Sequence, residues 1–530
     1  MPVPPRTGPA TTGLDQGKPT TGGRGDRPRI RHNDYSPLVP PPLGGWEPEL
    51  PVSVVIPAHG GQHRLDLTLA ALAAQTYPAG LLEVIVVDDG SEPPLRLPHD
   101  RPENTRLVPA APGGWGTAHA LNTGAAQAEG AVIQRLDSDM VICREHIEAL
   151  ARWHHLTDYV VTIGAKVFLD EPPLTAARVR AAVAAGELDS LFDMAAAIPS
   201  STEATIRRLD GLRTSKNPYH VCTGPTVSLR RDLFRAAGGL DPAVLRGEDT
   251  EFAYRLAMRG AVFVPDMAAR AVHLGIPAQR LDRDATVRVV APFLAQRVPL
   301  RRDLRKERGR RWLVPYVEVV LDATGRAEPE VRAAVGAALN GGLPDVAVTL
   351  LGPWASLTDG RHPVLGDPHF EARLIREQFR HDPAVTLAAE APRDPAPVPF
   401  RYTGPVDVPL ARRTLEQMIK TLSETRAGLL VVEFPDGRTA RLERTEAVNR
   451  ARLLAAEGED LAEVIELTHG VRHAASAEYW PSPAKDEGGS QQAPRRSAGG
   501  DGRATRDGGP ASPGAPEKLV RRLRTALRGR

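Results

Sequence analysis

The hydrophobic pattern of the first half alternates between two kinds of segment. Near-continuous apolar runs, PVSVVIPAHG (51–60), LLEVIVVDDGS (81–91) and AVIQRLDSD (131–139), predict strands buried on both faces. Between them, RLDLTLAALAAQTYP (64–78) and TAHALNTGAAQAEG (117–130) carry apolar or small residues at helical spacing and predict helices. Strand, helix, strand, helix, strand predicts a parallel α/β sheet.

The second half echoes this pattern after a basic stretch. YVEVVLDATG (316–325) parallels the first predicted strand, and EVRAAVGAALNGGLPDVAVTLLGPW (330–354) repeats helix, turn and strand. AGLLVVEFPDG (427–437) is expected in the slot of residues 131–139, with Pro435 and Gly437 in place of its two aspartates. We therefore expect a degenerate second copy of the same α/β unit. Convergence is the alternative, because all parallel α/β units share this periodicity.

Composition shifts divide the chain into six expected parts. They are a disordered tail rich in Pro and Gly (1–48), a first α/β domain (49–285), a basic helical connector (286–312), a second, degenerate α/β domain (313–480), a disordered linker (481–516) and a basic amphipathic C-terminal helix (517–530).

Charge and cysteine content restrict the function classes. The net charge is +2, from 67 basic and 65 acidic residues, so no overall field favours nucleic acid. Two cysteines, Cys143 and Cys222, make no disulfide framework and suit a reducing cytoplasm. No apolar run approaches the roughly 20 residues of a membrane span, and the first residues lack a signal-peptide core. We expect a cytoplasmic protein. The C-terminal helix either is a solvated tail or, as we favour, rests on the inner face of the membrane.

Acidic residues follow two of the predicted strands. Asp88 and Asp89 end one strand, and Asp137 and Asp139 end another. Ligands of such sheets bind beyond the carboxyl ends of the strands, so both pairs are expected to face one crevice. A polar turn is the alternative for each pair, because aspartate favours turns.

Further candidates lie downstream. Glu248 and Asp249 open a predicted amphipathic helix, where acidic residues are also stabilised by the helix dipole. His273 ends a strand-like run and is either a packed residue or a ligand. Other phosphate-binding motifs are absent or incomplete. The chain has no G-x-x-x-x-G-K-[ST] loop, and a dinucleotide-binding motif that begins at Gly114 has His119 in place of its third glycine.

Four motifs together carry a family resemblance. VSVVIPAHG, EVIVVDDGS, LDSD and GEDTEFAYRL, in this order, resemble family 2 glycosyltransferases of the GT-A fold over about residues 50–280. The resemblance implies a Rossmann-like nucleotide-diphospho-sugar transferase domain, followed by the degenerate GT-A-like copy. It also implies inverting, metal-dependent transfer of a sugar from a nucleotide diphosphate donor to a hydroxyl acceptor, in cell-envelope glycan or glycoconjugate synthesis.

The same resemblance implies roles for individual residues. Asp139 would ligate Mn²⁺ or Mg²⁺, Asp137 would hold the ribose or the metal shell, and His273 would add a ligand. Asp249 would be the general base, with Glu248 beside it. The residues implied in donor binding are Pro57, Ala58, His59, Asp88, Asp89 and Asp137.

Because the sequence departs from the family pattern at some positions, a second function remains an alternative. Leu121 stands where the family usually has an arginine, and Leu245-Arg246 replaces a tryptophan of the acceptor pocket. The acceptor is expected to be a glycan, a lipid-linked molecule or a small molecule, and the second domain could support a homodimer. The alternative function is a non-catalytic nucleotide-sugar sensor or scaffold. A nucleotidyltransferase is disfavoured, because the chain lacks the Gly-rich basic loop that holds a triphosphate.

Overall fold

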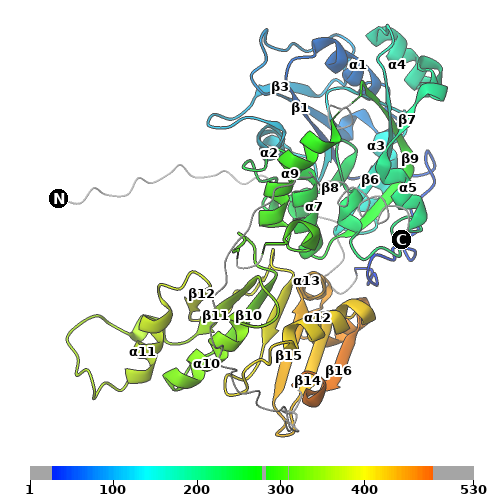
Figure 1. Cartoon of the computed structure of the whole chain (residues 1–530). Helices are drawn as coiled ribbons and strands as arrows, with labels where there is room; N and C mark the ends of the chain where they lie inside the picture. The colour runs from blue at the N-terminus through cyan, green and yellow to red at the C-terminus, as the bar shows by residue number, and fades with distance from the viewer. Residues whose placement is uncertain (1–26, 277–281, 308–309, 481–530) are drawn as a thin grey trace, which may run out of the picture. The chain divides into compact units, whose positions relative to one another are not determined.

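The first of two sheets is built between residues 52 and 274 (Figure 1). The structure, a computed structural model, describes residues 27–276, 282–307 and 310–480. Strand order in the first sheet is β3-β2-β1-β4-β8-β6-β9-β5, with β7 paired to β6. Its strands are β1 (Val52–Ala58), β2 (Leu82–Asp88), β3 (Thr105–Pro109), β4 (Val132–Arg135), β5 (Met140–Ile142), β6 (Val160–Leu169), β7 (Ile198–Pro199), β8 (Val227–Arg230) and β9 (Val262–Leu274).

The strands predicted from the apolar runs form the parallel part of this sheet. β1 pairs in parallel with both β2 and β4, and β2 with β3. The sheet as a whole is mixed, because β8 runs antiparallel to β4 and to β6. Since β2 and β4 flank β1, their carboxyl ends lie at one edge, as the position of the aspartates predicted.

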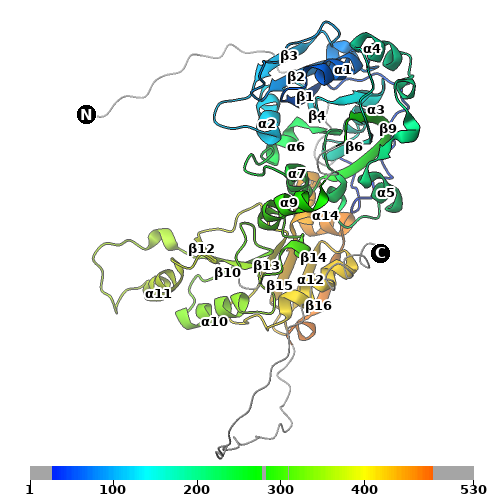
Figure 2. The same ribbon diagram turned by 45° about the horizontal axis from the view of Figure 1, so that its top comes forward.

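Helices cover both faces of this sheet (Figures 1 and 2). One core joins the sheet to α1, α3 and α4, and the other joins it to α2, α6 and α7. The helices are α1 (Gln62–Leu72), η2 (Ala79–Leu81), α2 (Thr117–Gln127), α3 (His146–His154), α4 (Ala176–Ala184), η3 (Leu188–Leu191), η4 (Met194–Ala196), α5 (Ser201–Arg208), η5 (Pro218–Val221), α6 (Arg231–Ala236) and α7 (Glu248–Met258). The connector contributes α9 (Arg283–Arg297) and η6 (Arg302–Leu304).

The second sheet has the order β12-β11-β10-β13-β15-β14-β16. Its strands are β10 (Val317–Asp322), β11 (Val346–Leu351), β12 (Val385–Ala388), β13 (Phe400–Thr403), β14 (Leu429–Glu433), β15 (Thr439–Arg444) and β16 (Val471–Ala475). Its helices are α10 (Glu328–Leu339), η7 (Trp354–Ser356), α11 (Phe370–Phe379), α12 (Thr414–Thr425), α13 (Thr445–Leu454), α14 (Leu461–Thr468) and η8 (Ser476–Glu478).

Strand pairing in the two sheets follows one plan. β10 pairs in parallel with β11 and β13, as β1 does with β2 and β4. β15 then runs antiparallel to β13 and β14, and β14 parallel to β16, which repeats the places of β8, β6 and β9. The second domain is therefore a topological copy of the first.

One prediction about this copy was wrong. Residues 427–437 contain β14, the counterpart of β6, whereas the counterpart of β4 is β13. The error has a simple cause: β13 is only 4 residues long, so it is a much weaker apolar signal than LLVVE.

The predicted disorder of residues 1–48 was wrong from Arg27 onward. Ile30 is fully buried, and it packs with Tyr35 and Leu38 in a cluster that includes side chains of both domains. Asn33 donates through Nδ2 to the carbonyl oxygens of Leu212 (3.1 Å) and Phe263 (2.9 Å). Three apolar residues thus outweigh a composition typical of disorder. Residues 1–26, the predicted linker 481–516 and the predicted helix 517–530 lie outside the described residues.

Specific contacts join the two domains. Asn449 of α13 donates through Nδ2 to Met258 O at the end of α7 (2.8 Å). Arg450 donates to Gly260 O (2.8 Å) and Ala261 O (2.9 Å) just beyond it. Among the described helices, none combines the length and the apolar character of a membrane span.

Candidate active site

Two carboxylates and an imidazole converge beyond the carboxyl end of β4. Asp137 and Asp139 lie between β4 and β5, and His273 lies near the end of β9. Antiparallel pairing of Met140 with His273 brings the histidine beside the aspartates. His273 Nε2 lies 3.5 Å from Asp139 Oδ1, and one ligand atom from each residue lies within 4.8 Å of the others.

The electrostatics of this cluster favour a cation. Burial raises the pKa of Asp139 to about 6, helped by the charge of Asp137 and opposed by His273 and by Arg64. The other ring nitrogen of His273, Nδ1, is buried and has no hydrogen-bond partner among the described residues. Carboxylate oxygens with an imidazole suit Mn²⁺ or Mg²⁺. The residues therefore fit the metal that the sequence predicted, with Asp137, Asp139 and His273 able to hold it.

Asp249, the predicted base, is tied to this cluster by an arginine. Its Oδ2 accepts the Gly224 N–H at 2.8 Å, and its Oδ1 accepts Arg135 Nη1. The Nε of the same guanidinium lies 3.2 Å from Asp137 Oδ1. A charge chain Asp137–Arg135–Asp249 thus crosses the site, and the Arg135 side chain is only 10% exposed.

The start of α7 needs a glycine to place Asp249. Gly247 adopts φ 86°, a left-handed conformation that side-chain-bearing residues rarely adopt. A Cβ there would also lie 3.0 Å from Val290 Cγ1 of α9. Backbone conformation and helix packing both therefore favour glycine before Glu248-Asp249.

The loops after β1 and β2 form a second part of the site. Pro57 and Ala58 end β1, and the exposed His59 follows, with Nδ1 3.0 Å from Asp89 O. Asp89 Oδ2 accepts the Gly116 N–H at 2.6 Å, just before α2. The predicted donor-binding residues Pro57, Ala58, His59 and Asp89 therefore lie together.

The last two predicted site residues are Asp88 and Glu248, and each is part of the local structure around it. Asp88 accepts the N–H groups of Ser91 (2.8 Å) and Leu95 (3.1 Å) with its two carboxylate oxygens. Burial acts to raise the pKa of Asp88, but hydrogen bonds from Ser91 and Leu95 outweigh it and hold the pKa below its ordinary value. This aspartate shapes its own loop. Glu248 is 7% exposed at the first position of α7.

Sequence reasoning missed two buried cations. Arg135 ends β4, and Lys166 lies within β6 with Nζ donating to Thr223 O at 2.7 Å. Burial lowers the pKa of Lys166 to about 8, while Asp137 acts to raise it. The signal was present for Arg135, a basic residue within an apolar run predicted to be buried on both faces, where a charge requires a partner. No strand was predicted around Lys166, although it also lies in an apolar run.

The second sheet has lost this chemistry in a specific way. Val55 pairs with Arg135, and Val320 correspondingly pairs with Thr403, so Pro405 corresponds to Asp137 and Asp407 to Asp139. Asp407 accepts Arg438 Nη1 at 2.6 Å. An arginine thus neutralises the one remaining carboxylate, and no grouping of metal ligands is found there among the described residues.

Comparison with known proteins gives a family match for the first domain. Residues 53–238 match the model of glycosyl transferase family 2. Chondroitin synthase of Escherichia coli is 24% identical over 357 residues, 64% of this chain and 50% of that protein. Hyaluronan synthase of Pasteurella multocida is 25% identical over 321 residues, 56% of this chain and 32% of that protein. The chain therefore spans half or less of the length of these curated relatives.

Among solved structures, TarS of S. aureus in complex with UDP-GlcNAc is 18% identical, with a TM-score of 0.33, over 47% of this chain and 68% of that chain. The mannosyltransferase PcManGT of Pyrobaculum calidifontis in complex with GDP-Man and Mn²⁺ is 18% identical, with a TM-score of 0.32, over 52% and 69%. The family match covers the strands that carry Asp89, Asp137 and Asp139. Residues 53–238, which build most of the first sheet, are therefore similar to glycosyl transferase family 2.

Proposed function

We propose that the chain is an inverting, metal-dependent glycosyltransferase that moves a sugar from a nucleotide diphosphate donor to an acceptor hydroxyl, in the synthesis of a cell-envelope glycan or glycoconjugate. The observation that carries this proposal is the convergence of Asp137, Asp139 and His273 at one end of a chain of contacts that leads through Arg135 to Asp249.

The proposed mechanism is a direct displacement. Bound Mn²⁺ or Mg²⁺ would supply positive charge to the diphosphate that leaves. Asp249 would take the proton of the acceptor hydroxyl, while the acceptor oxygen bonds to the anomeric carbon and the bond to the diphosphate breaks. The Gly224 N–H would hold the Asp249 carboxylate in orientation through Oδ2.

Arg135 offers a replacement for a basic residue that the family pattern leads one to expect at position 121. Leu121 and Arg135 line the same small cavity, together with Asp249. We propose that the positive charge has moved from α2 to β4 and that Arg135 orients Asp249 during the reaction. Loss of the arginine at position 121 then does not remove the charge from the site.

Donor and acceptor classes follow from the two parts of the site. Pro57, Ala58, His59 and Asp89 would contact the nucleotide, and Asp137 its ribose. The names of the relatives, chondroitin synthase and hyaluronan synthase, favour a glycan acceptor over a lipid-linked or small one. We propose that the reaction takes place in the cytoplasm, with the basic segment 517–530 at the inner face of the membrane. We also propose that the second domain binds the acceptor or forms a dimer.

A non-catalytic sensor of nucleotide sugars is the second candidate. The Arg135–Asp249 ion pair favours it, because a carboxylate held by a buried arginine is a weaker base than a free one.

Thermal melting with a panel of nucleotide diphosphate sugars, with and without MnCl₂, tests both candidates. A donor that binds the folded state raises the melting temperature. We expect a metal-dependent rise that Asp139→Asn abolishes and Asp249→Asn retains, while both variants lose transfer to glycan acceptors. Donor binding by the wild type without turnover over a broad acceptor panel would establish the sensor. Normal transfer by Asp139→Asn would refute the metal site.

A further inference from the structure

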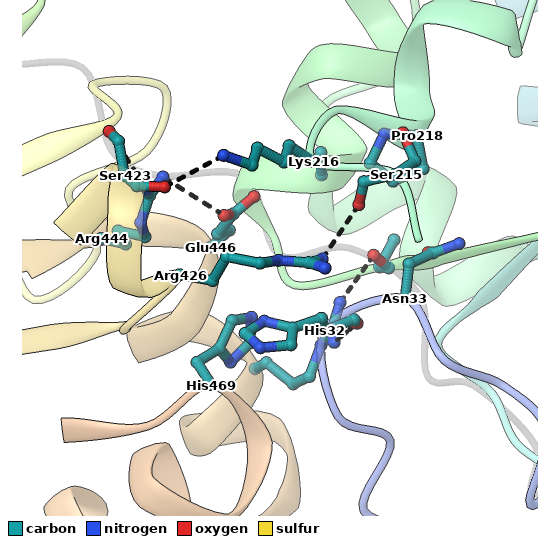
Figure 3. A pocket seen from close by; sticks show the side chains of 13 residues that line it. His32, Asn33, Ser215, Lys216, Pro218, Ser423, Arg426, Arg444, Glu446 and His469 are labelled. Carbon is teal, nitrogen blue, oxygen red and sulfur yellow. Dashed lines mark hydrogen bonds and ion pairs between the residues drawn. The ribbon is translucent and has the colours of Figure 1, made fainter. Parts of the chain in front are cut away.

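A basic cavity lies where the first domain, the second domain and residues 27–48 meet (Figure 3). Its volume is about 50 Å³. A buried water needs roughly 10–15 Å³, so the cavity has room for about four oxygen-sized atoms. It lies apart from the acidic cluster, since none of the candidate site residues lines it.

Positive charge in this cavity exceeds negative charge. Four cationic side chains line it, Lys216, Arg426, Arg444 and Arg450, against the single carboxylate of Glu446. The Glu446 Oε1 lies 3.8 Å from Arg444 Nη1, so even this pair is loose.

Two histidines of the lining add no compensating charge. Burial, together with the charge of Arg426, lowers the pKa of His32 to about 4. Burial and Arg450 likewise hold the pKa of His469 well below its usual range. Both rings are neutral at physiological pH and can accept or donate one hydrogen bond each.

The four cations differ in how far their hydrogen bonds are used. Arg450 is fully occupied, with Nε and Nη2 on Gly260 O and Ala261 O and Nη1 toward His32 O. Arg426, in contrast, makes one side-chain hydrogen bond among the described residues, from Nη2 to Ser215 O at 3.1 Å. Lys216 Nζ makes one, to Ser423 O at 3.2 Å.

Arg444 resembles these two rather than Arg450. Its Nε donates to Ala427 O at 3.1 Å, and its Nη2 reaches Ser423 Oγ only at 3.5 Å. Figure 3 shows the heads of Lys216 and Arg444 both directed toward Ser423, while Arg426 reaches across to Ser215. Carbonyl and hydroxyl oxygens satisfy individual donors, but they leave the net charge uncompensated.

We propose that this cavity is a binding site for a tetrahedral oxyanion of the phosphate class, held by Lys216, Arg426 and Arg444. A dianion supplies four acceptor oxygens and the missing negative charge. Both domains contribute to the site, so the bound anion ties Lys216 of the first domain to Arg426 and Arg444 of the second. None of the residues proposed to take part in the transfer reaction lines this site.

The cavity is also joined to the predicted base. Ser215 and Lys216 lie in the same short segment as Gly224. The Gly224 N–H donates to the Asp249 carboxylate. Ala257 and Ala261 line the cavity, and they lie in the last turn of α7 and just beyond it, at the end of the helix opposite to Asp249. An anion bound in the cavity would therefore contact the segment before Gly224 and the end of α7, the two elements that position the Asp249 carboxylate.

Thermal melting of the full chain in phosphate, against chloride at equal ionic strength and with EDTA present, tests the proposal. We expect phosphate to raise the melting temperature of the wild type. Lys216→Gln and Arg426→Gln should weaken the apparent affinity about tenfold, the effect of losing one charge-assisted hydrogen bond. Lys420→Gln is the matched control, because Lys420 is 72% exposed on α12 and outside the cavity.

Two further arms identify the ligand and its place. Glycerol 3-phosphate in parallel distinguishes a phosphate ester from the free ion, and tighter binding of either one supports the site and names its source. Asp139→Asn should keep the phosphate effect, since the acidic cluster is elsewhere. No stabilisation beyond that of chloride, or equal stabilisation of Lys216→Gln and Lys420→Gln, would overturn the proposal.

Discussion

Replacing Asp139 by asparagine should stabilise the metal-free protein at neutral pH. The folded protein raises the pKa of this carboxyl from 3.8 to about 6, chiefly through burial, with a contribution from Asp137. The folded state therefore binds the proton more tightly than the unfolded state does. The resulting penalty is absent below pH 3.8 and is complete once the pH exceeds about 6.

The size of the effect follows from the two pKa values. A difference of one in pKa is worth about 1.4 kcal/mol, so the ionised Asp139 costs about 3 kcal/mol at pH 7.5. At pH 4.5 the cost is only about 1 kcal/mol, because the folded state is then almost wholly protonated. Asparagine is nearly isosteric and carries no charge at either pH.

Urea unfolding in EDTA, followed by tryptophan fluorescence, measures this difference. We expect Asp139→Asn to raise the free energy of unfolding by about 2–3 kcal/mol at pH 7.5 and by about 1 kcal/mol at pH 4.5. The variant should also lose the stabilisation that Mn²⁺ gives the wild type at pH 7.5. Asp232→Asn, an exposed change at the start of α6, serves as control. Equal stability of wild type and Asp139→Asn at pH 7.5 would show that the ionised Asp139 carries no such penalty in the folded protein.

Three further predictions concern cations of the same domain and of the junction. Arg135→Leu should lower kcat by roughly 10- to 100-fold, with a smaller change in the donor KM. Adding Leu121→Arg should recover part of this loss, because position 121 would then supply the missing charge. A double variant no better than the single one would disprove this compensation. Lys166→Met should raise the free energy of unfolding by about 3 kcal/mol at pH 7, because burial lowers the pKa of Lys166 from 10.5 to about 8. The penalty is complete below pH 8 and fades toward pH 10.5, and a variant less stable than wild type at pH 7 would contradict this prediction. Arg450→Met should cost about 3–5 kcal/mol in urea unfolding, since three carbonyl groups lose a buried cationic donor; the exposed Arg438→Met is the control, and an equal effect of the two changes would be evidence against this reasoning.

The sequence predicted the parallel strands β1, β2 and β4 of the first sheet and their acidic edge, because both depend on local signals. Buried parallel strands are continuous apolar runs, and their carboxyl ends lie at one edge by topology alone. The position of His273 beside Asp139 depended instead on the pairing of β5 with β9, a long-range contact without a local pattern. The ion pairs of Arg135 depend on side-chain geometry and were missed. A cation within an apolar strand did indicate that a partner was required.

The second domain shows where periodicity fails. Both long strands β10 and β11 were found, but the short strand β13 was passed over in favour of the more apolar β14. Residues 27–48 were predicted to be disordered because composition is an average over the whole segment. Their order depends instead on three individual residues, Ile30, Tyr35 and Leu38, which pack in one buried cluster.

The packed N-terminal segment has a consequence for biosynthesis. Residues 27–48 leave the ribosome long before residues 459–468. Yet the His32 N–H donates to Thr468 O (2.8 Å), and Arg29 Nη2 pairs with Glu459 Oε1 (2.6 Å). A nascent chain that has completed only its first sheet lacks the α13 and α14 side chains against which this segment packs. Residues 27–48 therefore become fully ordered only after residues 459–468 have been translated, and a chain that stops before them should leave Ile30, Tyr35 and Leu38 partly uncovered.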